Sequence, residues 1–388
     1  EKVCEILANH YERVSSTGSH YAPGDFDPRH RQDIEQQVQE LRLHASHTHP
    51  CPDNLSQPLT APEVAAQCCR LNNNKAPSPL DNVYNELLKY GGDSLSAALA
   101  QFFDLQFALE TKAKTCGVIT PIYNNNPDRA PFDPAYAIGF YPIGLAPFTL
   151  GSALDKLYNM VLNSRIMAYL EDNDKLHDAQ QGFRPGRSAV DNIYMLHTCL
   201  EARCQQKLDT YMLFLDIEKA YDTVWRAGLL WHLWHKGITG KMFRVLAQML
   251  DNTPSCVMHN GAFSRVITPD MGWEQGDTLA TTMFTVFINS ILEEVWAQHE
   301  GVPIPTPADT NSLATKLVAL MYADDLVGFA TSPARLQAMA DHCKAALTKW
   351  QLRASVHATD TSKTAYMKVL GGPVSARLHA ARRAPPTH

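Results

Sequence analysis

The fold of this 388-residue chain is decided by Leu317–Ala330, which reads LVALMYADDLVGFA. Two short apolar runs flank the adjacent acids Asp324 and Asp325, and each run has the length and composition of a buried strand. The polar pair is typical of a tight turn, so the stretch predicts a β-hairpin. Neighbouring carboxylates beside an apolar hairpin repel each other and lose hydration, a cost that Mg²⁺ or Mn²⁺ relieves. For an isolated Asp-Asp pair, two solvated acids at a hairpin tip are the commoner arrangement.

A third carboxylate upstream favours the metal site. Residues 211–225 read YMLFLDIEKAYDTVW, and the apolar run Tyr211–Leu215 predicts a strand that delivers Asp216 at its C-terminal end. Strands far apart in the sequence are often neighbours in one sheet, so Asp216 can meet the acids of the hairpin. Three such carboxylates can hold two divalent cations about 4 Å apart, as two-metal phosphoryl transfer requires.

The two stretches together resemble motifs A and C of reverse transcriptases, in the non-LTR (LINE-like) retrotransposon branch. The motif residues are FLDIEKAYDTVW followed by MYADDLV, and the resemblance covers roughly Leu71 to Val369. It implies an α+β fold, a right-hand polymerase with palm and fingers, in which helices pack on an antiparallel palm sheet. The implied domains are an N-terminal extension or linker (1–70), fingers (71–205), a palm with the catalytic site (206–370) and a tail (371–388). The tail is too short for a helical thumb, which is expected to be largely missing.

The resemblance also implies the chemistry and the metal ligands. The reaction would be RNA-directed DNA synthesis, in which a primer 3′-hydroxyl attacks the α-phosphorus of a dNTP on an RNA template. Asp216, Asp324 and Asp325 would hold two Mg²⁺ (or Mn²⁺) ions, and Ile217 would add a backbone carbonyl as a ligand.

Four residues are assigned to the nucleotide by the same resemblance. Tyr221 stands where an aromatic ring lies under the sugar and excludes a 2′-hydroxyl; an isolated Tyr would be interpreted as a core residue. Gln275 and Gly276, within MGWEQGDTLATTMFTVFIN (271–289), would lie against the nucleotide and the template. Lys363, in SKTAYM (362–367), would face the triphosphate and protonate the leaving pyrophosphate.

The block QQGFRPGRSAVDN (180–192) resembles the family's G-F-R-x-G-R-S block. Gly182 and Gly186 would let the backbone approach a partner closely, and Arg184 and Arg187 would meet phosphates of template or primer. The alternative is a helix entry with Ser188 near its cap. Among the hairpin residues, Tyr322 is also assigned to nucleic acid.

Four of the departures from the family pattern change the charge expected around the triphosphate. Asn124 and Tyr141 stand where basic residues would meet the triphosphate, and Glu274 and Asp277 add negative charge near the same substrate. Arg129 is a candidate substitute. These departures motivate a second hypothesis, a catalytically decayed relic or an RNA-binding scaffold. A nucleotidyl cyclase with a palm-like sheet is disfavoured, because the blocks before Asp216 belong to a polymerase.

Local patterns predict several further elements. Thr60 followed by Glu63 predicts a capping box at a helix start, and Asn82 stands at a turn position that the family fills with Gly. Apolar spacing predicts helices over Ser94–Glu110, Leu154–Leu170, Leu229–Ile238, Met242–Leu250 and Pro333–Trp350.

Composition is that of a globular protein, with 45% hydrophobic and 19% charged residues and no run long enough to span a membrane. Nine cysteines without a C-x-x-C pair indicate reduced thiols, and hence an intracellular, nuclear or cytoplasmic protein. The first residue is not Met, which suggests part of a longer polyprotein.

The net charge of −6 is not typical of a nucleic-acid binder, so any positive channel must come from clustering of basic residues in space. His44, His47, His49 and Cys51 match no zinc spacing, and a solvated loop is favoured there.

Overall fold

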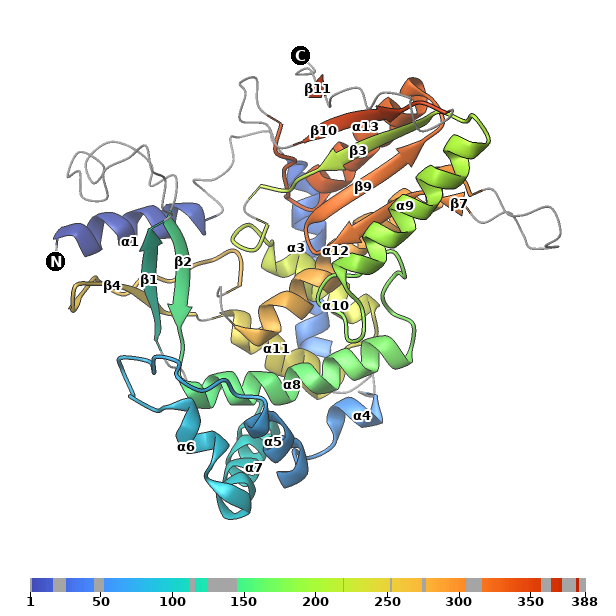
Figure 1. Ribbon diagram of the computed structural model, residues 1–388. Coiled ribbons are helices and arrows are strands. Elements are labelled where there is room, and N and C mark those ends of the chain that lie inside the picture. Colours follow the sequence, from blue (N-terminus) through green and yellow to red (C-terminus); the bar gives the residue numbers. More distant parts are fainter. Residues whose placement is uncertain are drawn as a thin grey trace. The chain divides into compact units, whose positions relative to one another are not determined.

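The computed structural model (Figure 1) describes residues 2–16, 26–44, 52–111, 116–123, 145–218, 220–251, 253–273, 277–304, 316–356, 364–371 and 382–383. The chain forms two compact units, Glu1–Asn173 with Tyr221–Met283, and Asp174–Ala220 with Phe284–His388. Each unit combines helices with antiparallel strand pairs, so the chain has an α+β fold. Both units are discontinuous in sequence, whereas the domains expected from the sequence were contiguous.

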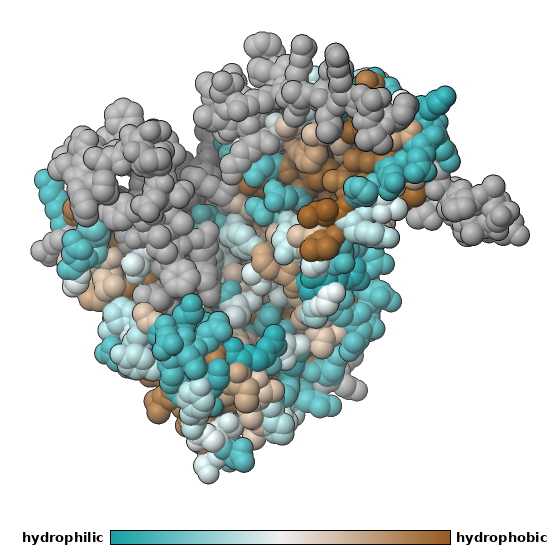
Figure 2. All heavy atoms as spheres, in the orientation of Figure 1, coloured by the Kyte–Doolittle hydropathy of each residue, from teal (hydrophilic) through white to brown (hydrophobic). Residues whose placement is uncertain are grey.

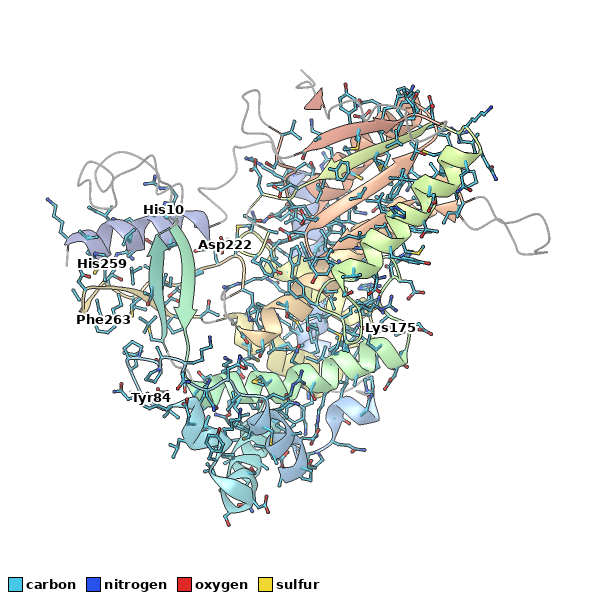
Figure 3. The ribbon with its side chains drawn as sticks, viewed as in Figure 1. His10, Tyr84, Lys175, Asp222, His259 and Phe263 are labelled. Atoms are coloured by element: carbon cyan, nitrogen blue, oxygen red, sulfur yellow. The ribbon has the colours of Figure 1, made fainter. Side chains whose placement is uncertain are left out.

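The first unit contains a four-stranded sheet in the order β2-β1-β4-β5. Its strands are β1 (Gly117–Tyr123), β2 (Leu145–Leu150), β4 (Ser255–His259) and β5 (Ala262–Phe263). Helix α1 (Lys2–Val14) packs on this sheet through Leu7, Ala8 and Tyr11, which share a buried cluster with Ile119, Val257 and Ile267. Figure 3 marks the β4–β5 hairpin by His259 and Phe263. Helix α1 therefore contributes to the buried core of the first unit.

Helices make up the rest of the first unit. They are α3 (Pro28–His44), α4 (Asp53–Ser56), α5 (Ala61–Cys69), α6 (Asn85–Lys89), α7 (Gly92–Ala108), α8 (Ala153–Asp172), α10 (Arg226–His235) and α11 (Gly240–Asp251). The predicted capping box is present, since Thr60 and Glu63 bond reciprocally at the start of α5. Asn82 has a φ of 53°, which confirms the positive-φ turn expected there.

The second unit is built on a five-stranded sheet in the order β11-β10-β3-β9-β8. Its strands are β3 (Thr210–Leu215), β8 (Ala319–Tyr322), β9 (Asp325–Ala330), β10 (Ala365–Val369) and β11 (Arg382–Arg383), and every pairing is antiparallel. A separate pair joins β6 (Val302–Pro303) to β7 (Lys316–Leu317). The helices are α9 (Ala189–Gln205), α13 (Pro333–Lys349) and, from Phe284 onward, α12 (Thr278–Gln298).

The two faces of this sheet are covered by different helices. On one face α13 packs so closely that a Cβ at Gly328 would lie 2.4 Å from the Met339 sulfur. On the other face Met212 and Phe329 share a buried cluster with Cys199 of α9. Figure 1 shows α9 beside β9, and Figure 2 shows hydrophobic residues on the visible side of this unit. Burial on both faces strongly fixes the register of β3 and β9.

The predicted hairpin is confirmed, with one correction to its turn. Tyr322 pairs with Asp325, so the two turn residues are Ala323 and Asp324, whereas the sequence suggested the two acids themselves. Asp325 is instead the first residue of β9. Asp325 directly precedes the apolar residues of β9, and the pairing of β8 with β9 extends to it.

No helix in the described part of the chain is both long and apolar enough to cross a bilayer. Each of the five helices predicted by apolar spacing is present within a few residues of its predicted ends.

Arg203, the largest fully buried side chain of the described residues, provides a test of the second unit's packing. It donates to Thr210 Oγ1 at 2.7 Å, to the Asp209 carbonyl at 2.7 Å and to the Pro303 carbonyl at 3.1 Å. Arg203→Met should lower the free energy of unfolding by about 3 kcal/mol or more, because buried acceptors lose a charged donor. Denaturant titration measures this.

The matched control is Arg335→Met. Arg335 forms an ion pair with Glu300 in which both side chains are more than half exposed, at 56% and 77%. Such pairs contribute about 0–1 kcal/mol, so this variant should unfold close to the unsubstituted protein. Equal unfolding midpoints for the two variants would contradict the packing role of Arg203.

Candidate catalytic site

The pairing of β3 with β9 sets two of the three predicted acids at neighbouring backbone positions. Leu215 stands opposite Leu326 in this antiparallel register, so the next step along both strands places Asp216 opposite Asp325. Residues directly opposite each other project from the same face with Cβ atoms about 4.5–5.5 Å apart. Asp216 is half-buried and Asp325 is exposed. The end of β3 and the start of β9 therefore carry two acids at neighbouring positions, at a solvent-accessible end of these strands.

The third acid, Asp324, lies in the adjoining turn and is half-buried. Within the described residues, no group of three or more His, Cys, Asp or Glu side chains is already assembled as a metal site. Like charges disfavour close approach of carboxylates until a cation neutralises them. The donors themselves fit Mg²⁺ or Mn²⁺, since they are hard carboxylate oxygens brought to one edge by adjoining segments.

The backbone around Ile217 is consistent with its predicted role as a carbonyl ligand. Ile217 forms an isolated antiparallel bridge with Ala354, made by Ser355 N donating to Asp216 O at 2.8 Å and Glu218 N donating to Arg353 O at 2.9 Å. Both bonds are made by the neighbours of Ile217, namely Asp216 and Glu218. In an antiparallel pair of this kind, the backbone carbonyl of the central residue, here Ile217, points away from the partner segment.

Gln180 is a residue near the site that sequence reasoning did not single out. Its side chain is completely buried and bonds to the backbone of Ala323, in the turn between β8 and β9. Gly182 beside it allows a close approach, because a Cβ there would lie 2.2 Å from Ala323 N. The close approach is to the hairpin itself. No local pattern links residues so distant in sequence, so only the strand pairing could have revealed this contact.

The two arginines of the same block have different environments. Arg184 is buried and donates through Nη1 to the carbonyls of His177 and Gln180, at 2.9 and 3.1 Å. It therefore braces its own loop, which makes it a poor candidate for phosphate contact. Arg187 is partly exposed and pairs with Asp178 at 2.8 Å, and this bond lowers the pKa of the Asp178 carboxyl.

The start of α9 confirms the alternative that the sequence left open. Ser188 and Asp191 form a capping box there, with Ser188 N donating to Asp191 Oδ2 at 2.7 Å. This helix entry is compatible with a surface role for Arg187, which directly precedes the cap.

Tyr221 belongs to the first unit, where its segment packs against residues 271–273. Gly272 N donates to Val224 O at 2.8 Å, and Trp273 N donates to Tyr221 O at 3.4 Å. Gly272 has a φ of 70°, and a Cβ there would lie 2.6 Å from the carbonyl oxygen of Asp222, which Figure 3 labels. Only glycine fits this contact. The candidate steric gate and the start of the 271–289 block are thus neighbours.

Asp277 is a helix cap, a role that the sequence analysis missed. Its Oδ1 accepts from Leu279 N at 3.0 Å at the start of α12, while its Oδ2 accepts from Asn159 Nδ2 and Trp273 Nε1, both at 2.8 Å. A carboxylate that accepts three hydrogen bonds at a helix N-terminus is stabilised locally. Its expected action against an anionic substrate is correspondingly weakened.

Several predicted residues lie outside the described parts of the chain. They are Gln275, Gly276 and Lys363 among the site residues, Asn124, Tyr141 and Glu274 among the departures from the family pattern, the candidate substitute Arg129, and His47, His49 and Cys51 of the His-rich stretch. Tyr322 is described: it ends β8 opposite Asp325 and is 38% exposed.

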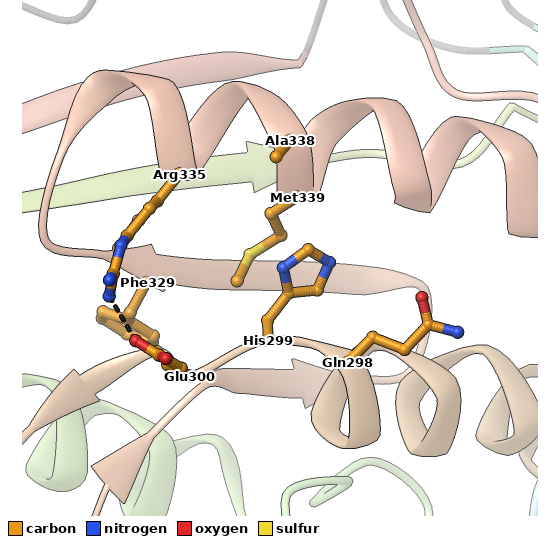
Figure 4. A pocket seen from close by; sticks show the side chains of 9 residues that line it. Gln298, His299, Glu300, Phe329, Arg335, Ala338 and Met339 are labelled. Carbon is orange, nitrogen blue, oxygen red and sulfur yellow. Dashed lines mark hydrogen bonds and ion pairs between the residues drawn. The ribbon is translucent and has the colours of Figure 1, made fainter.

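One pocket lies at the other end of β9 from Asp325 (Figure 4). Phe329, Met339 and His299 line it, and an ion pair between Arg335 and Glu300 lies at its side. Its volume is about 220 Å³, less than ligand sites usually have. Since β9 separates this pocket from the carboxylates, we do not assign it to the same site.

Comparison with known proteins gives the family. Residues 146–374 match the model described as reverse transcriptase (RNA-dependent DNA polymerase). The Pol polyprotein of the type-1 retrotransposable element R2 from Popillia japonica is 29% identical over 188 residues, covering 48% of this chain and 25% of that protein. The RNA-directed DNA polymerase from mobile element jockey of Drosophila funebris is 27% identical over 276 residues, covering 70% and 29%.

A third relative is the probable RNA-directed DNA polymerase from transposon X-element of Drosophila melanogaster, 26% identical over 279 residues, covering 69% of this chain and 27% of the relative. The chain thus spans between 25% and 29% of the length of these three relatives. The family model covers more than half of the chain and contains the paired acids. The chain therefore belongs to the reverse transcriptase family, in its non-LTR retrotransposon branch.

Proposed function

We propose that this chain is the RNA-directed DNA polymerase domain of a retroelement and is part of a longer polyprotein. The observation that carries the proposal is the register that sets Asp216 opposite Asp325 on one face of the sheet. Neighbouring carboxylates at the accessible ends of two paired strands destabilise the folded state, because like charges repel. Binding divalent cations is the chemistry that makes such a set useful. The substrates would be an RNA template, a DNA primer and dNTP.

In this proposal the five-stranded sheet is the palm of a right-hand polymerase, and residues 71–205 supply the fingers. Asp216, Asp324 and Asp325, with the Ile217 carbonyl, would hold two Mg²⁺ or Mn²⁺ ions. Bound there, such ions activate an attacking hydroxyl and stabilise a leaving phosphate oxygen.

The other residues would act on the substrates directly. Tyr221 would exclude the 2′-hydroxyl of a ribonucleotide, and Gln275 with Gly276 would position the base pair being formed. Lys363 would bind the triphosphate and give a proton to pyrophosphate. Arg187 and Tyr322, both at least partly exposed, remain the candidates for template or primer contact.

The second candidate function, a decayed relic or RNA-binding scaffold, is favoured by Asn124 and Tyr141. Each lost charge-assisted contact with phosphate would weaken nucleotide binding by about 1.5–3 kcal/mol. Asp277 adds less to this case, because its carboxylate caps α12. A relic should still fold and bind RNA without extending a primer.

Primer extension on poly(rA)/oligo(dT), with Mg²⁺ and then Mn²⁺, separates the two functions. Asp325→Asn should reduce extension at least about 100-fold, since even partners outside the ligand shell change activity by up to that factor. The control is Asp341→Asn, an exposed acid on α13 bonded to Gln337, which should extend normally. Absence of extension by the unsubstituted chain would favour the scaffold, whereas extension that Asp325→Asn leaves unchanged would contradict the role of Asp325 as a metal ligand.

Sugar selection tests the assignment of Tyr221. Tyr221→Ala should let the enzyme incorporate ribonucleotides beside deoxyribonucleotides, because removing the ring opens space for the 2′-hydroxyl. Tyr221→Phe keeps the ring and should retain discrimination. Single-nucleotide incorporation with matched rNTP and dNTP measures the ratio. If the Ala variant discriminates as well as the Phe variant, Tyr221 is a packing residue.

A further inference from the structure

We propose that Gln180 is a positioning residue for the catalytic carboxylates: its side-chain amide fixes the β8–β9 turn and thereby sets the places of Asp324 and Asp325. The inference rests on the proposed function, in which these two acids are metal ligands. Gln180 itself would touch neither metal nor substrate.

The contact is a complete pairing of one amide with one turn residue. Gln180 Oε1 accepts from Ala323 N at 3.0 Å, and Gln180 Nε2 donates to Ala323 O at 3.2 Å. Oε1 also accepts from Gly182 N at 2.8 Å. The side chain is 0% exposed, so water cannot replace these bonds. Both backbone polar groups of Ala323 therefore depend on a single side chain.

The turn needs such support because of its backbone geometry. Ala323 has a φ of 58°, a left-handed conformation that favours glycine in tight hairpin turns. An alanine held there carries strain, which persists only when the surroundings over-determine it. Asp324 follows Ala323 directly, so any relaxation of this backbone would move the first carboxylate and the start of β9.

The segment that carries Gln180 is itself fixed to the edge of the sheet. Because β8 is the edge strand, its outer side is open for pairing. Gln181 N donates to Met321 O at 2.9 Å, Met321 N donates to Ala179 O at 2.9 Å, and Asn192 Nδ2 also donates to Met321 O, at 3.1 Å. This short parallel bridge brings Gln180 to the turn.

An amide suits this position better than a charged group. It supplies a donor and an acceptor at once, as the N–H and C=O of Ala323 require. A carboxylate would lack the donor and add a fourth negative charge near the three acids, while an amine or guanidinium would compete with the cations. Reacting groups displaced by about 1 Å can lose a factor of about 100 in rate, so small movements of the turn matter.

The test compares Gln180→Met with Leu347→Ala, a buried substitution on α13 that lowers stability without touching the turn. Three quantities are measured: amide hydrogen exchange at residues 321–325, the Mn²⁺ dissociation constant, and the incorporation rate at saturating dNTP. In Gln180→Met, exchange at Ala323 should rise at least about tenfold, and Mn²⁺ affinity and rate should each fall about 10- to 100-fold. Leu347→Ala should leave the local exchange pattern, affinity and rate unchanged.

Gln180→Glu adds a readout that a purely structural role would not give. Protonated Glu regains the donor to Ala323 O and loses the extra charge, so the rate relative to the unsubstituted protein should recover as the pH falls.

Unchanged amide exchange and unchanged Mn²⁺ affinity in Gln180→Met would overturn the proposal. So would a normal rate in that variant while Asp325→Asn is inactive. If the unsubstituted chain extends no primer, the proposed function fails. Amide hydrogen exchange at Ala323 and the Mn²⁺ dissociation constant then still test the role of Gln180, because neither measurement needs polymerase activity.

Discussion

The pairing of β3 with β9 is the constraint on which the rest of the site depends. Each strand is buried on both faces, by α13 on one side and by the cluster that includes Cys199 on the other. A slip of β9 by one residue would turn Phe329 toward α13 and Asp325 to the opposite face from Asp216. Hydrophobic burial along the strands therefore fixes where the two carboxylates emerge. Packing of the apolar residues stabilises the register, and the register sets the positions of the acids at the exposed end of the strands.

Much of this arrangement was predictable from sequence because its signals are local. An apolar run ending in Asp216 and two apolar runs around Asp324 are enough to predict the strands, and Thr60 with Glu63 is enough for a helix start. The turn was misplaced by one residue, since alanine is not a residue expected at positive φ. What holds it there is Gln180, whose role depends on a contact across more than one hundred positions.

Other features were missed for the same reason. Helix α1 has an amphipathic pattern, but the sheet it covers is formed by residues around Ile119 and Val257, so nothing near it in sequence shows that it is core. Asp277 looked like an unfavourable charge because the donors that surround it, Asn159 among them, come from another helix. Charge placement is a property of the fold, which a count of residues cannot supply.

The charge balance has a related explanation. Several arginines that a sequence count would offer to nucleic acid are engaged internally, as in Arg165 with Glu63 on neighbouring helices. Burial raises the pKa of the Glu63 carboxyl, but hydrogen bonds from Arg165 and Thr60 outweigh it and hold the pKa at about 2. In the proposed function, a chain with net charge −6 and arginines committed to such pairs would depend on bound cations to attract a polyanion.

The most direct test of the account is the stoichiometry and coupling of Mn²⁺ in the complex with primer, template and a non-reacting dNTP analogue, measured by electron paramagnetic resonance. The account predicts two spin-coupled ions, and it predicts that Asp216→Asn and Asp325→Asn each abolish the coupling although the two acids come from strands far apart in sequence. Tight Mn²⁺ binding that neither substitution changes would contradict it.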